Sequence, residues 1–243
     1  MTTVALIGAD GAGKTTVARY LETGGRIPVR YLYLGVNAEA SNHLLPTTRL
    51  ARWAKRRRGR VEDHGPPPAV ARNEGPRPAR RPPGKALKAW AKLANRVADE
   101  WYRQGVASWF ERRGHIVVFD RHYLADFAAH DMDRGASLPP ERRLHGWLLR
   151  RFYPEPDLVV FLDAPAETLL ARKGEGSLED LRRRRDDYLP MAGEVRHFVV
   201  VDASQPLDGV VEAVERELRA FVGGERGPVQ LAGRPPASST VAP

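Results

Sequence analysis

The feature that most constrains the fold is a glycine-rich segment near the start of the chain, which matches the pattern G-x-x-x-x-G-K-[ST] at residues 8–15. A short apolar run at 3–7 predicts a buried strand before it, and the spacing at 14–22 predicts a helix after it. Between a strand and a helix, such glycines let backbone N–H groups converge on phosphate oxygens. Lys14 then reaches the β- and γ-phosphates, and the Thr15 hydroxyl is placed to bind Mg²⁺. The segment therefore predicts a phosphate-binding loop.

Short apolar runs alternate with helical patterns along the rest of the chain. Five strands are expected, at 3–7, 29–34, 115–119, 158–162 and 197–201. The expected helices are 14–22, 44–58, 85–113, 139–152, one opening at Pro165, 178–194 and 207–222, with a further helical stretch near 122–133. This alternation predicts an α/β fold with a doubly wound, five-stranded parallel sheet. Ligands of such sheets bind at the carboxyl ends of the strands.

The positive charge is concentrated in one segment. The formal net charge is +9, and residues 55–85 hold ten basic and three acidic side chains, so the remainder is nearly neutral. Residues 59–84 contain seven of the 20 prolines and almost nothing apolar, which predicts a disordered insertion. We expect one folded domain over 1–222 and a disordered tail over 223–243. For the basic segment, a solvated loop is favoured over binding to a polyanion or an acidic lipid.

The composition excludes several classes of protein. A hydrophobic content of 42% is enough for a core, and no apolar run approaches the roughly 18–20 residues of a membrane span. The first residues lack the basic region of a signal peptide, and the absence of Cys excludes a disulfide framework and a thiol nucleophile. We therefore expect a soluble cytoplasmic protein. Four tryptophans are expected in its core: Trp90, Trp101, Trp109 and Trp147.

Charged residues end two of the predicted strands. Asp120 and Arg121 close the third strand, where a carboxylate can hold Mg²⁺ through water or accept a proton, and a guanidinium can bind a phosphate. Asp163 ends the fourth strand and fits either the Mg²⁺ site or a cap on the helix that follows. These residues extend the predicted site along the sheet edge.

An arginine-rich stretch at 172–188 surrounds two glycines. It predicts a mobile lid whose arginines fold over a transferring phosphoryl group, exclude water and neutralise charge. A solvated basic helix is the alternative interpretation, and it is favoured for Arg184 and Arg185.

With these residues in place, the chain resembles the thymidylate kinase family of P-loop nucleoside monophosphate kinases. A phosphate-binding loop with an acidic residue in its middle, G-A-D-G-A-G-K-T-T (8–16), is the form that this family uses. Other segments that resemble family motifs are L-A-N-R (93–96), D-R-H-Y (120–123), P-D-L-V-V-F-L-D-A-P-A-E-T-L-L-A-R (156–172) and V-D-A-S-Q-P-L-D-G-V (201–210). The resemblance implies a fold of the P-loop kinase type. It also implies transfer of a phosphoryl group from ATP to a nucleoside monophosphate, with thymidylate as the leading candidate.

The resemblance also implies a donor site for ATP and Mg²⁺. Thr15 and Asp120 would hold the metal, while Lys14, Asp10, Asp120 and Arg121 would lie near the reacting phosphates, with Arg172 and Arg182 in the lid. The ATP-binding residues would be Gly8, Ala9, Asp10, Gly11, Ala12, Gly13, Lys14, Thr15 and Thr16 in the loop, and Ala203, Ser204 and Gln205 beside the adenine.

The acceptor half of the site departs from the family pattern. The resemblance implies that Arg96 and Arg121 bind the acceptor phosphate. The interval between Arg96 and Asp120 is a few residues longer than in the family, so Arg103 is an alternative to Arg96. After the second strand, L-G-V-N-A-E-A (34–40) replaces the family's T-R-E-P-G-G-like segment.

Two other functions stay open. One is a related phosphotransferase with a different small acceptor, and the other is a nucleotide-dependent binding protein whose basic segment engages nucleic acid or a membrane. On the leading interpretation the partners are small nucleotide substrates and not nucleic acid. Because many family members are dimers, a homodimer is a further expectation.

Overall fold

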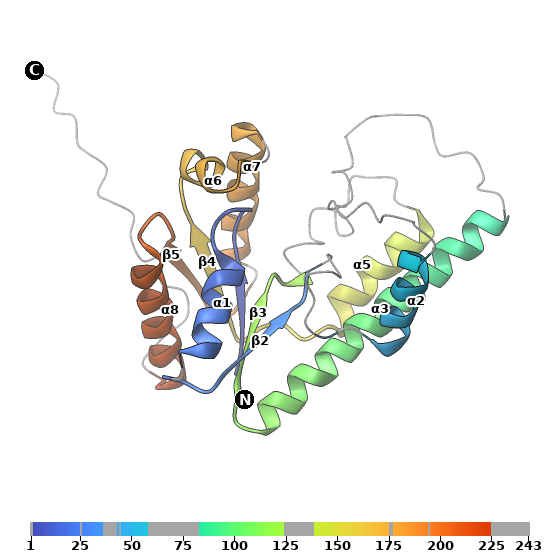
Figure 1. Ribbon diagram of the computed structural model, residues 1–243, viewed down its shortest axis with the longest axis horizontal. Coiled ribbons are helices and arrows are strands. Elements are labelled where there is room, and N and C mark those ends of the chain that lie inside the picture. Colours follow the sequence, from blue (N-terminus) through green and yellow to red (C-terminus); the bar gives the residue numbers. More distant parts are fainter. Residues whose placement is uncertain are drawn as a thin grey trace, which may run out of the picture. The chain divides into compact units, whose positions relative to one another are not determined.

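The structure is a computed structural model, and it describes residues 2–24, 26–35, 43, 45–57, 83–123, 139–174, 177–193 and 195–224 (Figure 1). Most of the predicted insertion at 59–84 and of the predicted tail at 223–243 therefore lies outside the described residues. The same holds for all but the start of the helical stretch expected near 122–133.

Five strands form one parallel sheet, as predicted. They are β1 (Thr2–Ile7), β2 (Val29–Tyr33), β3 (Ile116–Asp120), β4 (Leu158–Asp163) and β5 (Phe198–Asp202), in the order β2-β3-β1-β4-β5. The register aligns Tyr33 with Asp120 between β2 and β3, and Asp163 with Asp202 between β4 and β5. All five residues of β3 are buried, which agrees with a continuous apolar strand covered on both faces. The α/β fold class is therefore confirmed.

Helices connect and flank the strands. They are α1 (Lys14–Thr23), α2 (Pro46–Arg57), α3 (Pro83–Arg112), α5 (Pro140–Phe152), α6 (Ala166–Lys173), α7 (Leu178–Tyr188) and α8 (Leu207–Val222). One expected helix is shorter than predicted, because α7 ends at Tyr188 and a 3₁₀ turn (Leu189–Gly193) replaces its last residues. Pro190 lies in that turn, and proline cannot donate the backbone hydrogen bond of a helix interior.

The chain divides into two compact units, which we describe separately. The first contains residues 1–5 and 22–156, and the second contains residues 6–21 and 157–243. The glycine-rich loop and α1 belong to the second unit, whereas Asp120 and Arg121 belong to the first.

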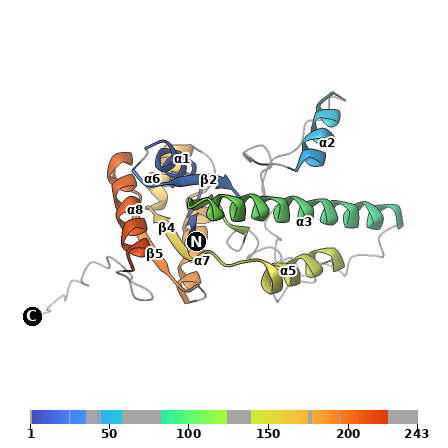
Figure 2. The same ribbon diagram turned by 90° about the horizontal axis from the view of Figure 1, so that it is seen from below.

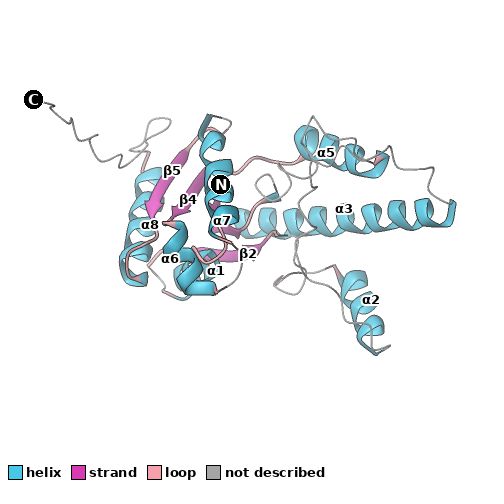
Figure 3. Ribbon diagram, turned by 90° about the horizontal axis from the view of Figure 1, so that it is seen from above, coloured by secondary structure: helices cyan, strands magenta, loops and turns pink. Residues whose placement is uncertain are grey.

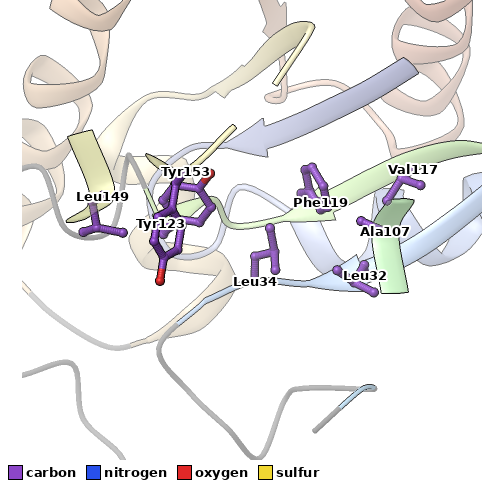
Figure 4. Close-up of a cluster of buried hydrophobic side chains, with 8 residues drawn as sticks. All are labelled: Leu32, Leu34, Ala107, Val117, Phe119, Tyr123, Leu149 and Tyr153. Carbon is purple, nitrogen blue, oxygen red and sulfur yellow. The ribbon is translucent and has the colours of Figure 1, made fainter. Parts of the chain in front are cut away.

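The core of the first unit joins α3 and α5 to β2 and β3. Figure 4 shows its eight buried side chains, and Figure 2 shows α3 as one long helix. The rings of Tyr123 and Tyr153 pack edge to face with centroids 4.7 Å apart, and the Tyr123 hydroxyl donates to the Pro154 carbonyl oxygen at 2.5 Å. This core fixes the carboxyl ends of β2 and β3. The cluster consists of Leu32, Leu34, Ala107, Val117, Phe119, Tyr123, Leu149 and Tyr153.

The core of the second unit lies between β4, β5 and their helices (Figure 3). The rings of Phe161 and Phe198 come from adjacent strands and have centroids 6.2 Å apart. On α8 the apolar residues Val210, Val214 and Leu218 recur at helical spacing, and all three are buried. This packing holds the carboxyl ends of β4 and β5 in place.

Candidate functional site

The glycine-rich loop adopts a backbone that side chains would not tolerate. Gly8, Gly11 and Gly13 have φ angles of 147°, 90° and 86°, a region that L-residues rarely adopt. A Cβ on Gly8 would lie 2.6 Å from the Leu162 carbonyl oxygen, and one on Gly11 would lie 2.8 Å from that of Leu169. Glycine is therefore required here both for the turn and for the close approach to β4 and α6.

Lys14 is the first residue of α1, and its ammonium group is held at the loop. Its Nζ donates to the carbonyl oxygens of Gly8 at 2.7 Å and Ala9 at 2.8 Å, and the side chain is buried. Nothing lies within 4 Å of the position that a Cβ on Gly13 would occupy, so the loop has open space at that point. A buried cation, helix N-terminal amides and open space together suit a phosphate group. Thr15 is half-buried and follows directly on the same helix turn.

Helix α7 contacts this loop through Arg184 and the end of β4 through Arg185. Arg184 Nη1 lies 2.7 Å from Asp10 Oδ2, and the Arg184 side chain is 40% exposed. Arg185 forms a bidentate ion pair with the Asp163 carboxylate, with Nε 2.6 Å from Oδ1 and Nη2 2.7 Å from Oδ2. This hydrogen bonding to Asp163 raises the pKa of Arg185. The interpretation of Arg184 and Arg185 as a merely solvated basic face is therefore wrong, because Arg184 reaches Asp10 of the glycine-rich loop and Arg185 reaches Asp163 at the end of β4.

The two preceding arginines behave differently. Arg182 is 62% exposed and pairs with Glu167, and Arg183 is 61% exposed and pairs with Asp180 on the same helix. A hydrogen bond from its own backbone N–H, followed by the Arg182 guanidinium, lowers the pKa of Glu167. Of the run 182–185, Arg182 thus lies on the surface of α6 and α7, away from the contacts that Arg184 and Arg185 make.

Arg172 holds the loop that follows β5. Its guanidinium donates to the carbonyl oxygens of Ala203 at 2.7 Å and Ser204 at 3.2 Å, and more weakly to that of Gln205 at 3.5 Å. Asp202 accepts hydrogen bonds from the hydroxyl and the backbone N–H of Ser204, which lowers the pKa of its carboxyl group. The predicted adenine loop and Arg172 are thus brought together.

Asp163 does not cap the following helix. The N-cap residue of α6 is Pro165, and it makes no side-chain capping hydrogen bond. The Asp163 carboxylate faces Arg185 instead, and its carbonyl oxygen accepts from the Ala203 N–H at 2.6 Å. The capping interpretation is therefore wrong, because tertiary contacts with α7 and the β5 loop engage this residue.

In the first unit, Asp120 and Arg121 end β3 as predicted. Asp120 is fully buried, and the Tyr31 hydroxyl donates to its Oδ2 at 3.3 Å. Arg121 has a φ of 60°, and it is the one non-glycine residue with positive φ in the part of the chain that the structure describes. Its Cδ lies 2.7 Å from the position that a Cβ on Gly35 would occupy. Strained backbones of this kind concentrate at functional sites.

Arg103 reaches the same place from α3. Its Nη1 donates to the carbonyl oxygens of Tyr33 and Gly35, each at 3.3 Å, and its Nη2 pairs with Asp99 at 2.9 Å. Arg103 and Arg121 therefore both lie against Gly35, at the carboxyl end of β2. Arg96 is exposed and lies two helical turns earlier, about 10 Å along the axis.

A buried polar network supports this region, and the sequence analysis missed it. Glu100 Oε2 accepts from the Tyr153 hydroxyl at 2.6 Å and lies 3.1 Å from His145 Nε2, with all three side chains buried. The Glu100 carboxylate thus links α3 to α5 and to the residue that follows α5. The available signal was a pair of adjacent acidic residues, Asp99 and Glu100, in a helix that is otherwise mainly basic and apolar up to that point.

Within the described residues there is no cluster of three or more His, Asp or Glu side chains able to hold a metal ion. No described helix has both the length and the apolar composition needed to cross a membrane.

The prediction that four tryptophans lie in the core is wrong. Trp90, Trp101, Trp109 and Trp147 are 41–50% exposed. Trp101 contacts the ring of Tyr153, with centroids 5.3 Å apart, but nearly half of its surface stays exposed. Helical spacing alone did not show how much of each tryptophan is covered.

The chain is similar to two curated proteins named as probable thymidylate kinases. It is 35% identical over 116 residues to the one from Archaeoglobus fulgidus, which covers 45% of this chain and 56% of that relative. It is 30% identical over 103 residues to probable thymidylate kinase 1 from Saccharolobus solfataricus, which covers 40% of this chain and 51% of that relative. The chain thus spans about half the length of the curated relatives it matches. No family model matches the chain. These similarities support a relationship to thymidylate kinases.

Proposed function

We propose that the chain is an ATP- and Mg²⁺-dependent nucleoside monophosphate kinase that converts dTMP and ATP to dTDP and ADP. The observation that carries this proposal is Lys14, a buried ammonium at the N-terminus of α1 inside a loop whose glycines have positive φ. The similarity to two probable thymidylate kinases supports the choice of acceptor.

The donor half would use the second unit. ATP would supply the phosphoryl group, and Mg²⁺ held by the Thr15 hydroxyl would neutralise phosphate charge. Lys14 would exchange its contacts with the loop carbonyls for phosphate oxygens. The loop at 203–205, held by Arg172, would contact the adenine.

The acceptor half would use the first unit. Arg103 and Arg121 converge on Gly35, and their guanidinium groups suit the phosphate of the acceptor. We assign Arg103 this role in preference to Arg96, because Arg103 reaches the carboxyl end of β2. Arg103→Met should raise the KM for the acceptor at least roughly ten-fold, since a charged hydrogen-bond donor is lost. Arg96→Met is the matched control, and the opposite pattern would transfer the role to Arg96.

The lid would be helix α7. We assign charge neutralisation of the transferring phosphoryl group to Arg184 and Arg185, and structural roles to Arg172 and Arg182, because Arg184 contacts the phosphate-binding loop itself. Removing one such group costs on the order of 100-fold in kcat. Arg184→Gln should show that loss, whereas Arg183→Gln, which removes an exposed arginine from the same helix, should change kcat less than about two-fold. Equal effects of the two substitutions would contradict this assignment.

The direct test of the acceptor is a coupled assay of ADP release with ATP, Mg²⁺ and a panel of nucleoside monophosphates. The proposal predicts the highest kcat/KM for dTMP. Clear preference for another monophosphate would support the proposed kinase activity but assign it a different acceptor. ATP binding without turnover of any monophosphate would overturn the proposal.

One observation favours a second candidate, a related phosphotransferase with a different small acceptor. The chain leaves β2 as Leu34-Gly35 where the family pattern has T-R-E-P-G-G, and residues 36–40 lie outside the described residues. The same panel, extended to other small phosphate acceptors, separates the two. The homodimer stays a prediction, which light scattering of the full chain would test.

A further inference from the structure

Helix α2 exposes apolar side chains that a helix of a folded domain normally buries. Leu50 is 65% exposed and Trp53 is 53% exposed. They are three residues apart, so they share one face of the helix. The guanidinium of Arg57 lies over the Trp53 ring, 4.1 Å from its centroid, and it also faces solvent. An apolar stripe on an amphipathic helix usually packs on a core, so this one requires another partner.

The sequence that contains this stripe is strongly basic. The sequence of α2, Pro46–Arg57, contains five Lys and Arg and no acidic residue. Residues 46–98 hold 15 basic and three acidic side chains, while the rest of the chain holds 24 basic and 27 acidic ones. The net positive charge of the protein therefore comes entirely from the part of the chain that contains α2.

Contacts attach the start of α2 to α3. Asn95 Nδ2 donates to the Thr48 hydroxyl at 3.2 Å, and the Leu45 N–H donates to Asp99 Oδ1 at 2.9 Å. The α3 residues before this point are also basic, with exposed Lys85, Lys88 and Lys92, and no acidic residue precedes Asp99 in that helix. The start of α2 is thus attached to a helix whose preceding residues also include exposed lysines.

We propose that α2 docks on the surface of an anionic lipid bilayer, with Leu50 and Trp53 entering the interface and the basic residues facing lipid headgroups. An amphipathic helix that is rich in Lys and Arg and carries exposed Leu and Trp lies in the interface plane of such a bilayer. Nucleic acid would match the charge and could stack on Trp53, but it offers no apolar partner for Leu50, which is the more exposed of the two. This inference does not depend on the proposed kinase activity.

The test is co-sedimentation of the full chain with phosphatidylcholine vesicles that contain 30% phosphatidylserine, compared with phosphatidylcholine alone. We expect binding to the anionic vesicles only, weakened strongly between 50 and 500 mM salt because the attraction is screened. Vesicles with brominated acyl chains should quench fluorescence in the wild type, and Trp53→Phe should remove most of that quenching.

Paired variants separate the two contributions. Arg49→Gln with Arg57→Gln should weaken vesicle binding roughly 25-fold, at about five-fold per cation near an anionic surface. Leu50→Ser with Trp53→Ser should weaken it at least roughly ten-fold, because apolar burial is lost. Matched controls are Arg150→Gln with Arg151→Gln, and Leu207→Ser with Val222→Ser, which alter exposed residues elsewhere and should leave binding within about two-fold.

Three outcomes would overturn the proposal. The first is no binding to anionic vesicles at 50 mM salt. The second is binding that survives the substitution of both Leu50 and Trp53. The third is tighter binding to a DNA duplex than to the vesicles, unaffected by those two substitutions, which would assign the surface to nucleic acid.

Discussion

Burial of His122 makes the stability of the first unit sensitive to mild acid. This residue follows Arg121, is 2% exposed, and packs against the rings of Tyr123 and Phe119 with centroids 4.1 and 5.6 Å away. Burial lowers its pKa from 6.5 to about 3. The imidazole is therefore neutral in the folded protein across the physiological range.

The sign of the pH effect follows from the direction of that shift. Below pH 6.5 the unfolded chain binds a proton at His122 that the folded protein does not, so the unfolded state gains stability. The contribution of His122 is complete above pH 6.5 and is lost as the pH falls toward 3. Between pH 7 and pH 5 the linkage relation gives a loss of about 2 kcal/mol in the free energy of unfolding from this one residue.

Urea denaturation at pH 7, 6 and 5 measures this loss. The wild type should lose about 2 kcal/mol more over that interval than His122→Asn or His122→Gln, which cannot be protonated. If neither variant folds, NMR titration of His122 in the wild type replaces the comparison, with a midpoint below pH 5 expected. Equal pH dependence in wild type and variants, or a midpoint near 6.5, would refute the reasoning.

Three other substitutions test the packing and the loop. Gly8→Ala should weaken ATP binding more than about ten-fold in calorimetry without loss of helix content, because the new Cβ would lie 2.6 Å from the Leu162 carbonyl oxygen. Phe119→Ala should lower the free energy of unfolding by about 3–5 kcal/mol, since the ring is 2% exposed in the core of the first unit. Tyr153→Phe should cost about 1–3 kcal/mol, because Glu100 loses a buried hydrogen bond. An unchanged ATP dissociation constant would contradict the prediction for Gly8→Ala. Unfolding curves that superimpose on that of the wild type would contradict the predictions for Phe119→Ala and Tyr153→Phe.

The sequence predicted the fold well because its strands are short, apolar and bounded by glycine, proline or aspartate. All five strands lie within about one residue of their expected ends. The exceptions have local causes: the helix expected to reach residue 194 stops at Tyr188, and Pro190 explains why the regular hydrogen bonding does not continue.

The candidate site could be predicted where its residues are close together in the sequence. The glycine loop is continuous in sequence, so its positive φ angles and the position of Lys14 follow from the motif. The partners of Arg184 and Arg185 lie 174 and 22 residues away, and a run of arginines does not reveal which members face inward. The hydrogen bonds of Glu100 could not be predicted for the same reason, because they depend on how α3 packs on α5.

The most direct test of the central claim, phosphoryl transfer at the glycine-rich loop, compares ADP release by wild type, Lys14→Ala and Lys92→Ala with ATP, Mg²⁺ and dTMP. The account predicts dTMP-dependent turnover in the wild type and in Lys92→Ala, which removes an exposed lysine of α3. It predicts loss of turnover in Lys14→Ala with an unchanged circular dichroism spectrum. Near-normal turnover in Lys14→Ala would contradict it.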